Sequence, residues 1–470
     1  MKTRLLAVGL VLALVAAACG SRASRQEVQS ADANSGLSGN AQNSTGGPAA
    51  GPGGTSQPGM FGTLPSPCGP GDASGATDVG VTDTEIKVVT IADPGGAKPG
   101  LNQGVFDSMK AFEKWCNEQG GINGRKLKVE LRDAKLSEYQ AQVKYGCENA
   151  LALVGSMGVL DQTGAQDQVD CGLPNVAAAA VSPEQTGADF TFQPLPNPVD
   201  SYLVGPAQWV ARTYPDVIKN AAALRTKLSI TEIQSNRLIE AYKTVGFNFT
   251  YVDSANIGET NWAPLVLSMK NQGVTYMTLT SSFEEIIPLQ RTMDQQGLHP
   301  VVELEANFYN LKYPQQAGSV ADGTFVRLTT WPFEEADQNP AMAEYLRALK
   351  AAVPNAEPEL LGVQAWSAAL LWATAVKELG SDVTRAGLIE KLSQIHQWDG
   401  GGLHGTSDPG ANKPAPCYII MKVEGGGFVR QYPKPDTDAA VYDRGHGFDC
   451  SPSNIVALTG NYGSGAKAER

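Results

Sequence analysis

Short apolar runs alternate with amphipathic stretches along most of the chain. Residues 85–91 (EIKVVTI) and 126–131 (KLKVEL) have the β-branched, partly alternating pattern of strands. Between them, residues 105–116 place apolar side chains at helical spacing, and this pattern stops at Gly120 and Gly121. A strand, a helix and a second strand in this order predict a βαβ unit with parallel strands.

The same alternation continues along the chain, and the proline-rich residues 194–198 separate two series of such units. Apolar stripes predict core helices within residues 361–379 and 388–395, and residues 417–423 and 428–432 form a predicted hairpin. We therefore expect an α/β fold with two parallel sheets. The other expected elements are strands at 152–155, 174–180, 221–230, 247–252, 274–279 and 301–304, and helices at 138–151, 202–213, 235–245, 262–272 and 283–296.

Length and charge narrow the possible functions. The chain has 470 residues, more than the roughly 250 to 300 that one hydrophobic core organises, so two lobes are expected. It carries 48 acidic and 36 basic side chains, with a formal net charge of -12. Because an acidic chain without a dense Lys/Arg patch repels phosphate backbones, no nucleic acid partner is expected. The charge indicates solubility and says nothing about the ligand.

The first residues have the pattern of an export signal. Lys2 and Arg4 precede the uncharged, apolar residues 5–18, which cover about 21 Å as a helix and are too short for a membrane core of roughly 30 Å. The alanines at 16–18 precede Cys19, an arrangement that resembles a bacterial lipobox, although Ala16 stands where Leu is usual. We expect a signal peptide at 1–18 and a lipid on Cys19. An ordinary secretory signal next to a cysteine is the alternative.

Residues 19–78 are rich in Gly, Ser, Asn, Ala and Pro, with Phe61 as their only aromatic side chain. Such a composition predicts a flexible segment that buries no core. As a random coil it would span about 40 Å, which suits a tether that holds a folded body away from a membrane. A leader without a role is the alternative.

Without Cys19, six cysteines remain for an oxidising compartment, and six permit fifteen pairings. A zinc site is the alternative, but the sequence contains no CxxC, and its histidines have no ligand-like spacing to the cysteines, so no metal is expected. The pairs that we expect are Cys147 with Cys171, Cys417 with Cys450 and Cys68 with Cys116.

Several motifs resemble one family of exported proteins. GGINGRKL at residues 120–127 is the most specific, and GVTDTEIKV at 80–88, VSPEQT at 181–186 and GETNW at 258–262 support it. Over residues 80–432 the chain resembles type I periplasmic binding proteins of the branched-chain amino acid type. The resemblance implies two Rossmann-like lobes joined by three hinge crossovers. It also implies the domain limits 79–199 plus 331–412 for lobe 1, 200–330 plus 413–432 for lobe 2, and 433–470 for a surface tail.

The resemblance also implies a function. Such proteins close on a small ligand and deliver it to the permease subunits of an ABC importer. We therefore expect a monomeric, lipid-anchored binding protein on the outer face of the bacterial cytoplasmic membrane, with no cofactor and an amino-acid-like or amide-like ligand. A ligand sensor of the same fold, coupled to a signalling partner, is the alternative.

The candidate ligand contacts lie in loops at the carboxyl ends of predicted strands, where open α/β sheets bind ligands. By resemblance, the backbone and one hydroxyl at residues 178–182 receive the charged end of the ligand, and Glu305 pairs with an ammonium group. Amino-acid-binding relatives typically carry aromatic residues where this chain has 280–282 (TSS), which leaves the ligand open. The candidates are Gly95, Gly96, Ser156, Met157, Ala179, Ala180, Val181, Ser182, Ser281, Ser282, Glu305 and Asn307.

Each candidate also has a purely structural interpretation. The two glycines can serve a tight turn, Ser156 and Ser182 can cap helices, and Glu305 can be an exposed strand end. Trp366 can line the cleft or belong to a helix core.

An exported hydrolase is the competing class of function, but GxSxG and HExxH are absent from the sequence. The GxGxxG at residues 400–405 follows a predicted helix, not a strand, which indicates a loop and no dinucleotide site. We therefore expect no enzymatic activity.

Overall fold

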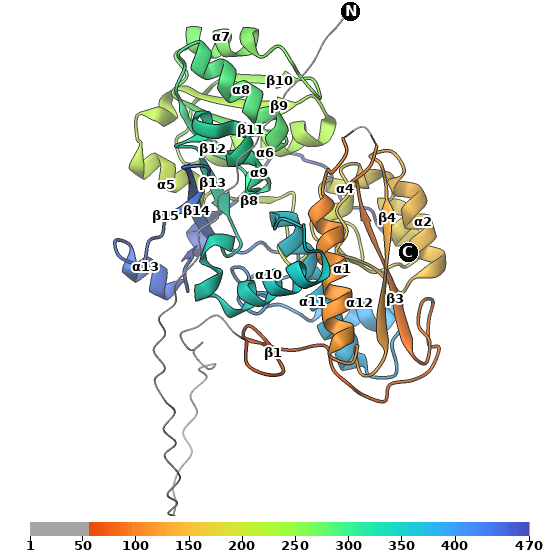
Figure 1. The fold of residues 1–470 in the computed structure, drawn as a ribbon. Helices are drawn as coiled ribbons and strands as arrows, with labels where there is room; N and C mark the ends of the chain where they lie inside the picture. The colour runs from red at the N-terminus through yellow and green to blue at the C-terminus, as the bar shows by residue number, and fades with distance from the viewer. Residues whose placement is uncertain (1–55, 97, 470) are drawn as a thin grey trace, which may run out of the picture. The chain divides into compact units, whose positions relative to one another are not determined.

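Five parallel strands form the sheet of the first lobe in the computed structural model, which describes residues 56–96 and 98–469. All the described residues belong to one structural unit. In Figure 1 this lobe lies at the lower right of the view. The strands, in their spatial order, are β4 (Lys126–Asp133), β3 (Glu85–Ala92), β5 (Ala152–Val154), β6 (Asn175–Val176) and β7 (Thr191–Phe192).

Helices from two separate stretches of the chain cover this sheet. Helix α1 (Gln103–Glu118) is buried along one face, as the spacing of residues 105–116 predicts. Helices α10 (Pro340–Ala352) and α11 (Leu360–Leu379) pack against α1. The first stretch contributes α1 (Gln103–Glu118), α2 (Tyr139–Asn149), α3 (Ala165–Asp170), α4 (Pro183–Thr186) and a 3-10 turn at Asp161–Thr163. The second contributes α10 (Pro340–Ala352), α11 (Leu360–Leu379), α12 (Arg385–Ser393) and a 3-10 turn at Phe333–Gln338.

The second lobe has a mixed sheet in the order β10-β9-β11-β12-β13-β14-β15, with β16 also paired to β14. The strands from β10 to β13 are parallel, and β14 runs antiparallel to its neighbours. The strands are β9 (Ala221–Thr226), β10 (Phe249–Ala255), β11 (Tyr276–Thr280), β12 (Val301–Leu304), β13 (Phe325–Leu328), β14 (Cys417–Glu424), β15 (Gly427–Tyr432) and β16 (Asp449–Cys450). The helices are α5 (Gly205–Thr213), α6 (Ser229–Lys243), α7 (Ala263–Asn271), α8 (Phe283–Gln295), α9 (Lys312–Ala317) and α13 (Ala439–Arg444), with 3-10 turns at Val217–Asn220, Ala306–Phe308, Gly318–Ala321 and Pro452–Asn454.

Up to the end of β15, the chain passes between the lobes three times. It leaves the first lobe after β7, returns to it after β13, and re-enters the second lobe at β14. The α/β class with parallel sheets that the sequence predicts is therefore confirmed, and the antiparallel strands at one side of the second sheet extend it. Because each lobe holds segments distant in sequence, a hinge between the lobes must lie in these crossovers.

Residues 56–78 differ from the expected tether. They contain a hairpin of β1 (Met60–Phe61) and β2 (Leu64–Pro65), and the Phe61 ring is fully buried against Trp115 and Trp366. One aromatic anchor and one disulfide hold this stretch on the first lobe, which a composition-based argument overlooks. The signal peptide, Cys19 and the rest of the tether lie outside the described residues.

All three expected disulfides are present. Each joins two pieces of one lobe, so none prevents the lobes from moving relative to each other. Cys68–Cys116 ties the β1–β2 segment to α1, Cys147–Cys171 ties α2 to the end of α3, and Cys417–Cys450 ties β14 to β16.

The tail from residue 433 touches both lobes, and part of it belongs to the second lobe, since Phe448 is buried and β16 pairs with β14. Its strand β17 (Ile455–Ala457) pairs with β8 (Ser201–Leu203) in the first crossover. Beyond β17, the backbone of Thr459 donates to Glu240 on α6 of the second lobe. Further on, Lys467 pairs with Asp189 of the first lobe at 2.9 Å.

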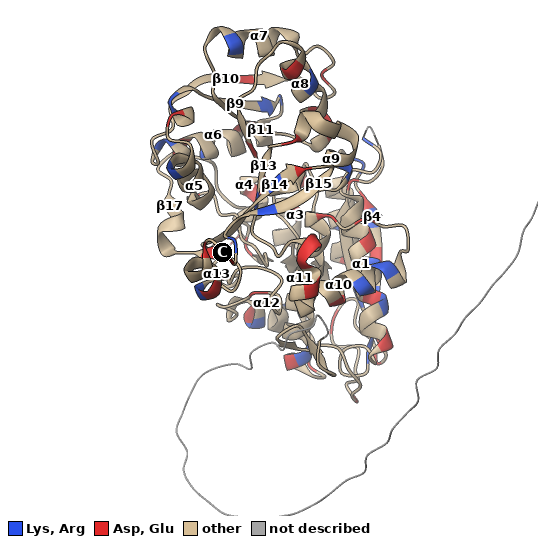
Figure 2. Cartoon of the chain, turned by 60° about the vertical axis from the view of Figure 1, so that its left-hand side comes forward, with Lys and Arg blue, Asp and Glu red and all other residues tan. Residues whose placement is uncertain are grey.

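Charged side chains of both signs are interspersed over the outer helices and strands, as along α1 in Figure 2. Among the described residues, no helix combines the length and the apolar character needed to cross a membrane.

Candidate functional site

A cavity of about 440 Å³ lies between the two lobes. Its walls come from the carboxyl ends of parallel strands and the loops that follow them: Met157 after β5, Ala179 after β6, Thr226 at the end of β9, Ser281 after β11 and Glu305 after β12. Parallel strands end at the same edge of a sheet, so two sheets whose carboxyl edges face one another form such a cavity from short loops. This volume lies within the range of roughly 300–1,000 Å³ found for pockets that take drug-sized ligands.

Most of the residues proposed from the sequence line this cavity. They are Met157, Ala179, Ala180, Val181, Ser281, Ser282, Glu305 and Asn307.

The other four candidates have partners elsewhere. Gly95 donates its backbone N–H to Asp133 (3.3 Å), and Gly96, at a φ of 75°, turns the chain beside the Lys135 backbone. Ser156 is buried and its hydroxyl accepts the Ile91 N–H at 3.0 Å. These three residues therefore do not line the cavity.

Ser182 is the helix cap that its sequence allows. Its hydroxyl accepts the Gln185 N–H at 3.1 Å and begins α4, with Pro183 in the first turn. The side chain is buried, so it contacts the helix and not the cavity.

The carboxylate of a side chain of this protein accepts hydrogen bonds from the backbone of the loop at residues 179–182. One oxygen of Asp161 accepts the Val181 N–H at 2.7 Å, and the other accepts the Ser182 N–H at 3.0 Å. The neighbouring Ala180 N–H donates to Gln193 at 2.9 Å. Burial of Asp161 raises the pKa of its carboxyl to about 7, against the hydrogen bonds that lower it.

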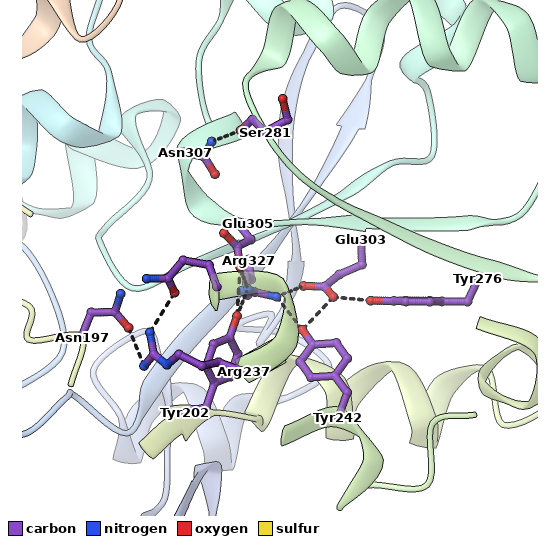
Figure 3. Close-up of polar contacts among 11 residues, drawn as sticks. Asn197, Tyr202, Arg237, Tyr242, Tyr276, Ser281, Glu303, Glu305, Asn307 and Arg327 are labelled. Carbon is purple, nitrogen blue, oxygen red and sulfur yellow. Dashed lines mark hydrogen bonds and ion pairs between the residues drawn. The ribbon is translucent and has the colours of Figure 1, made fainter. Parts of the chain in front are cut away.

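The floor of the cavity is an ion-pair network (Figure 3). Arg327 on β13 donates to Glu305 at 2.7 Å and to Glu303 at 2.9 Å. The Tyr202 hydroxyl also donates to Glu305, at 2.9 Å. Glu303 is fully buried and accepts a further hydrogen bond from Tyr276 at 2.6 Å. Strands β12 and β13 are neighbours, so the alternating residues Glu303 and Glu305 reach the same arginine.

A second buried arginine lies beside this network. Arg237 on α6 donates to Asn197 at 3.1 Å and to Gln234 at 2.8 Å, and its guanidinium lies 5.6 Å from the Tyr202 ring centroid. Burial lowers its pKa. Its hydrogen-bond partners are neutral, and it attracts Glu305 through space, so with Arg327 the cluster holds two charges of each sign.

The remaining lining includes many aliphatic side chains, which the sequence interpretation missed. The spacing of such residues looks the same whether they face a core or a cavity, so no pattern in the sequence separates the two. Examples are Leu101, Leu136 and Val159 from the first lobe, Leu228, Ile230 and Ile257 from the second, and Leu360 and Leu361 at the start of α11.

The lobes also touch across the cavity. The Lys98 ammonium lies 3.3 Å from Glu285 on α8 and 3.4 Å from the Ser282 hydroxyl. On another side the Gln234 amide donates to the Val181 carbonyl at 3.0 Å. These contacts join the first lobe to the second without any covalent link.

Two residues considered in the sequence belong to the core. Trp366 is fully buried among Phe61, Phe112 and Trp115, so the core interpretation is the correct one. His404, in the glycine-rich loop, lies 2.8 Å from the Ser367 hydroxyl, but both side chains are buried away from the cavity and the other imidazole nitrogen faces the Gly405 carbonyl. In the described part of the chain, no group of three or more His, Cys, Asp or Glu side chains could hold a metal ion.

Comparisons with known proteins agree with this architecture. A family model described as Periplasmic binding protein matches residues 85–427. No curated protein matches the chain.

Several solved structures share the fold at low sequence identity. A fatty acid ABC transporter substrate-binding protein from Thermomonospora curvata is similar with a TM-score of 0.66 and 16% identity, covering 77% of this chain and 95% of that one. A solute-binding protein from R. palustris in complex with benzoate has a TM-score of 0.64 and 14% identity, covering 80% and 98%. A leucine-binding protein from Thermotoga maritima has a TM-score of 0.62 and 15% identity, covering 75% and 99%.

The family match spans most of the two-lobed body. The chain therefore belongs to the periplasmic binding protein family and has the type I fold of ABC-transporter substrate-binding proteins.

Proposed function

We propose that this chain is the substrate-binding component of an ABC importer, anchored by a lipid on Cys19 to the outer face of the cytoplasmic membrane. The observation that carries the proposal is the cavity between the lobes, because a ligand there contacts loops of both sheets at once. Such contacts form fully only when the lobes are closed, so the ligand shifts the population toward the closed state. A permease that recognises the closed state then receives the ligand.

The three crossovers supply the hinge, and the contacts across the cavity supply the closed geometry. Lys98 and Gln234 each bridge to the opposite lobe and separate when the lobes open. The structural relatives are named for leucine, a fatty acid and benzoate, so one fold serves solutes of different chemistry. The sequence leads us to expect an amino-acid-like or an amide-like ligand. Of these two, we favour the amide-like ligand, because it is uncharged.

The lipid anchor has a direct test. Cys19→Ala removes the thiol that carries the lipid, so the protein should move from the membrane fraction to the soluble exported fraction, as measured by fractionation and by the mass of the N-terminal peptide. Ser21→Ala is the control and should stay with the membrane. Retention on the membrane of a Cys19→Ala protein from which residues 1–18 have been removed would contradict the anchor.

Capture and delivery need a separate experiment. Native mass spectrometry of the purified protein should detect a bound small molecule, and small-angle X-ray scattering should show that its removal increases the radius of gyration. Cross-linking on intact membranes should recover permease subunits. Recovery of a kinase or cyclase instead would favour a sensor of the same fold, and the absence of any released solute would contradict solute capture.

A further inference from the structure

The two positions that would receive the charges of an amino acid are already filled by this chain's own side chains. In the first lobe the candidate is the loop at residues 179–182, whose backbone N–H groups point toward an acceptor. In the second lobe it is Glu305, the candidate partner of an ammonium group. Three N–H groups of the loop and one carboxylate oxygen of Glu305 have partners within the protein before any ligand arrives.

At the loop, the acceptors are internal. Asp161 takes the N–H groups of Val181 and Ser182, one with each oxygen, and Gln193 takes the N–H of Ala180. A carboxylate ligand would find these donors occupied and would meet a second carboxyl group behind them. Displacing Asp161 would leave a buried acid without its hydrogen bonds, which is costly.

At the floor, the acid is already paired. Arg327 lies 2.7 Å from Glu305, and the Tyr202 hydroxyl is a second donor to the same oxygen. Arg327 in turn is shared with Glu303, which is fully buried. With Arg237 the cluster holds two positive and two negative charges, so an incoming ammonium would have to break an internal ion pair to gain a new one.

The third charged group of the lining is Lys98, and it too has a partner. Its ammonium lies 3.3 Å from Glu285, whose carboxylate also accepts the Gly258 N–H at 2.8 Å. Lys98, Glu305 and Arg327 are the charged residues of the lining in the described part of the chain. Each of these three charged side chains therefore has an oppositely charged partner within the protein.

The rest of the lining consists of aliphatic side chains and neutral polar groups. Thr329 and Gln364 line the cavity, and neither side chain makes a hydrogen bond to another of the described residues. A hydroxyl and an amide can satisfy a ligand hydroxyl, carbonyl or amide without any ionic charge. Around them lie the leucine, isoleucine and valine side chains of both lobes.

We propose that the cavity takes an uncharged, mainly apolar molecule bearing hydroxyl, carbonyl or amide groups, and that it excludes free amino acids. The inference rests on the proposed function, because it assumes that the cavity between the lobes is the solute site. It deepens that function by naming the class of solute.

The test compares molecules that differ only in the charge of one end. Decan-1-ol and decanamide are uncharged, decanoate is an anion and decylammonium is a cation, and L-leucine represents the zwitterions. Isothermal titration calorimetry at pH 7.5 should show the two uncharged compounds binding at least about tenfold more tightly than either ion, because a charge here is desolvated without a partner. L-leucine should give no heat of binding.

A charge introduced into the lining should reverse this preference. Leu361→Lys places an unpaired ammonium in the cavity, so it should make decanoate bind at least about tenfold more tightly than decan-1-ol. Leu267→Lys, on the exposed face of α7, makes the same substitution away from the cavity and should keep the original preference. The head-group comparison on the unaltered protein stands whether or not Leu361→Lys folds.

The outcomes separate the ligand class from the proposed function. Binding of L-leucine, decanoate or decylammonium as tightly as decan-1-ol would overturn the ligand class, and so would the absence of binding by both uncharged compounds. In either case the release of some other solute, with a change in the radius of gyration, would leave solute capture intact. Equal head-group preference in both leucine variants would place the binding outside this cavity and overturn the inference.

Discussion

Asp161 shows how a single side chain changes the meaning of a motif. The VSPEQT motif correctly indicates a family and a loop at the ligand edge of the first sheet. Whether the N–H groups of that loop are available depends on a residue twenty positions earlier in the chain, which reaches them only in the folded protein. Ser182 is similar, since the sequence permits both a ligand contact and a cap, and the fold selects the cap.

The raised pKa of Asp161 predicts a pH-dependent stability. Its carboxyl titrates near 3.8 when solvated and near 7 in the folded protein, so between these values the folded state holds a proton that the unfolded chain releases. The free energy of unfolding should therefore decrease as the pH rises from about 4 to about 7, by on the order of 3 to 4 kcal/mol from this group. Urea unfolding at several pH values measures it.

Asp161→Asn cannot titrate, so its unfolding free energy should change less with pH over the same interval, even though the variant loses one backbone hydrogen bond. Asp170→Asn, at the exposed end of α3, is the matched control and should keep the pH dependence of the unaltered protein. An unchanged slope in Asp161→Asn would contradict the assignment.

At the scale of elements, periodic patterns predicted the long helices and the paired strands well. The stripe at residues 361–379 corresponds to α11 (Leu360–Leu379), and the strand at 301–304 corresponds to β12 (Val301–Leu304). The strand expected at 174–180 is only β6 (Asn175–Val176), because the following residues leave the sheet to meet Asp161 and Gln193. Helix α10 was not predicted, although Asn339 and Pro340 form a recognisable helix start.

The β1–β2 segment is the element that composition misjudged, and its anchor can be tested. Phe61→Ala removes a fully buried ring from the cluster with Trp115 and Trp366, so it should lower the free energy of unfolding by about 3 to 5 kcal/mol. Chemical denaturation followed by tryptophan fluorescence measures the loss. Met60→Ala, at the half-buried neighbouring position, should cost clearly less. A loss in Phe61→Ala no larger than in Met60→Ala would show that the segment is not part of the core.

At the scale of the whole molecule, the proposed closure of the lobes would depend on the noncovalent contacts that join them. The disulfides lie within lobes, whereas Lys98 and Glu285 join one lobe to the other. The side chain of Lys98 is 27% exposed and that of Glu285 is 5% exposed, so the pair is partly screened by water and is expected to contribute about 1 kcal/mol or less. The tail, which touches both lobes, limits how far they separate.

Lys98→Ala should therefore increase the ligand-free radius of gyration measured by small-angle X-ray scattering, because the closed population loses one stabilising contact. Raising the salt concentration to about 1 M should open the unaltered protein slightly and leave Lys98→Ala almost unchanged, since salt screens the pair. Lys135→Ala removes an exposed ion pair within the first lobe and is the control. Identical scattering of all three proteins would exclude a role for this pair in closure.

The sequence alone determined the α/β class, the two lobes and most of the loops that face the cavity. These features follow from local periodicity and from motifs, which act over short stretches of chain. Only the tertiary structure decided which polar groups in those loops remain available to a ligand. Asp161, Arg327 and Glu285 are distant in sequence from their partners, which are the N–H groups of the loop, the Glu305 carboxylate and the Lys98 ammonium. These interactions require distances of about 3 Å, which no local sequence pattern predicts.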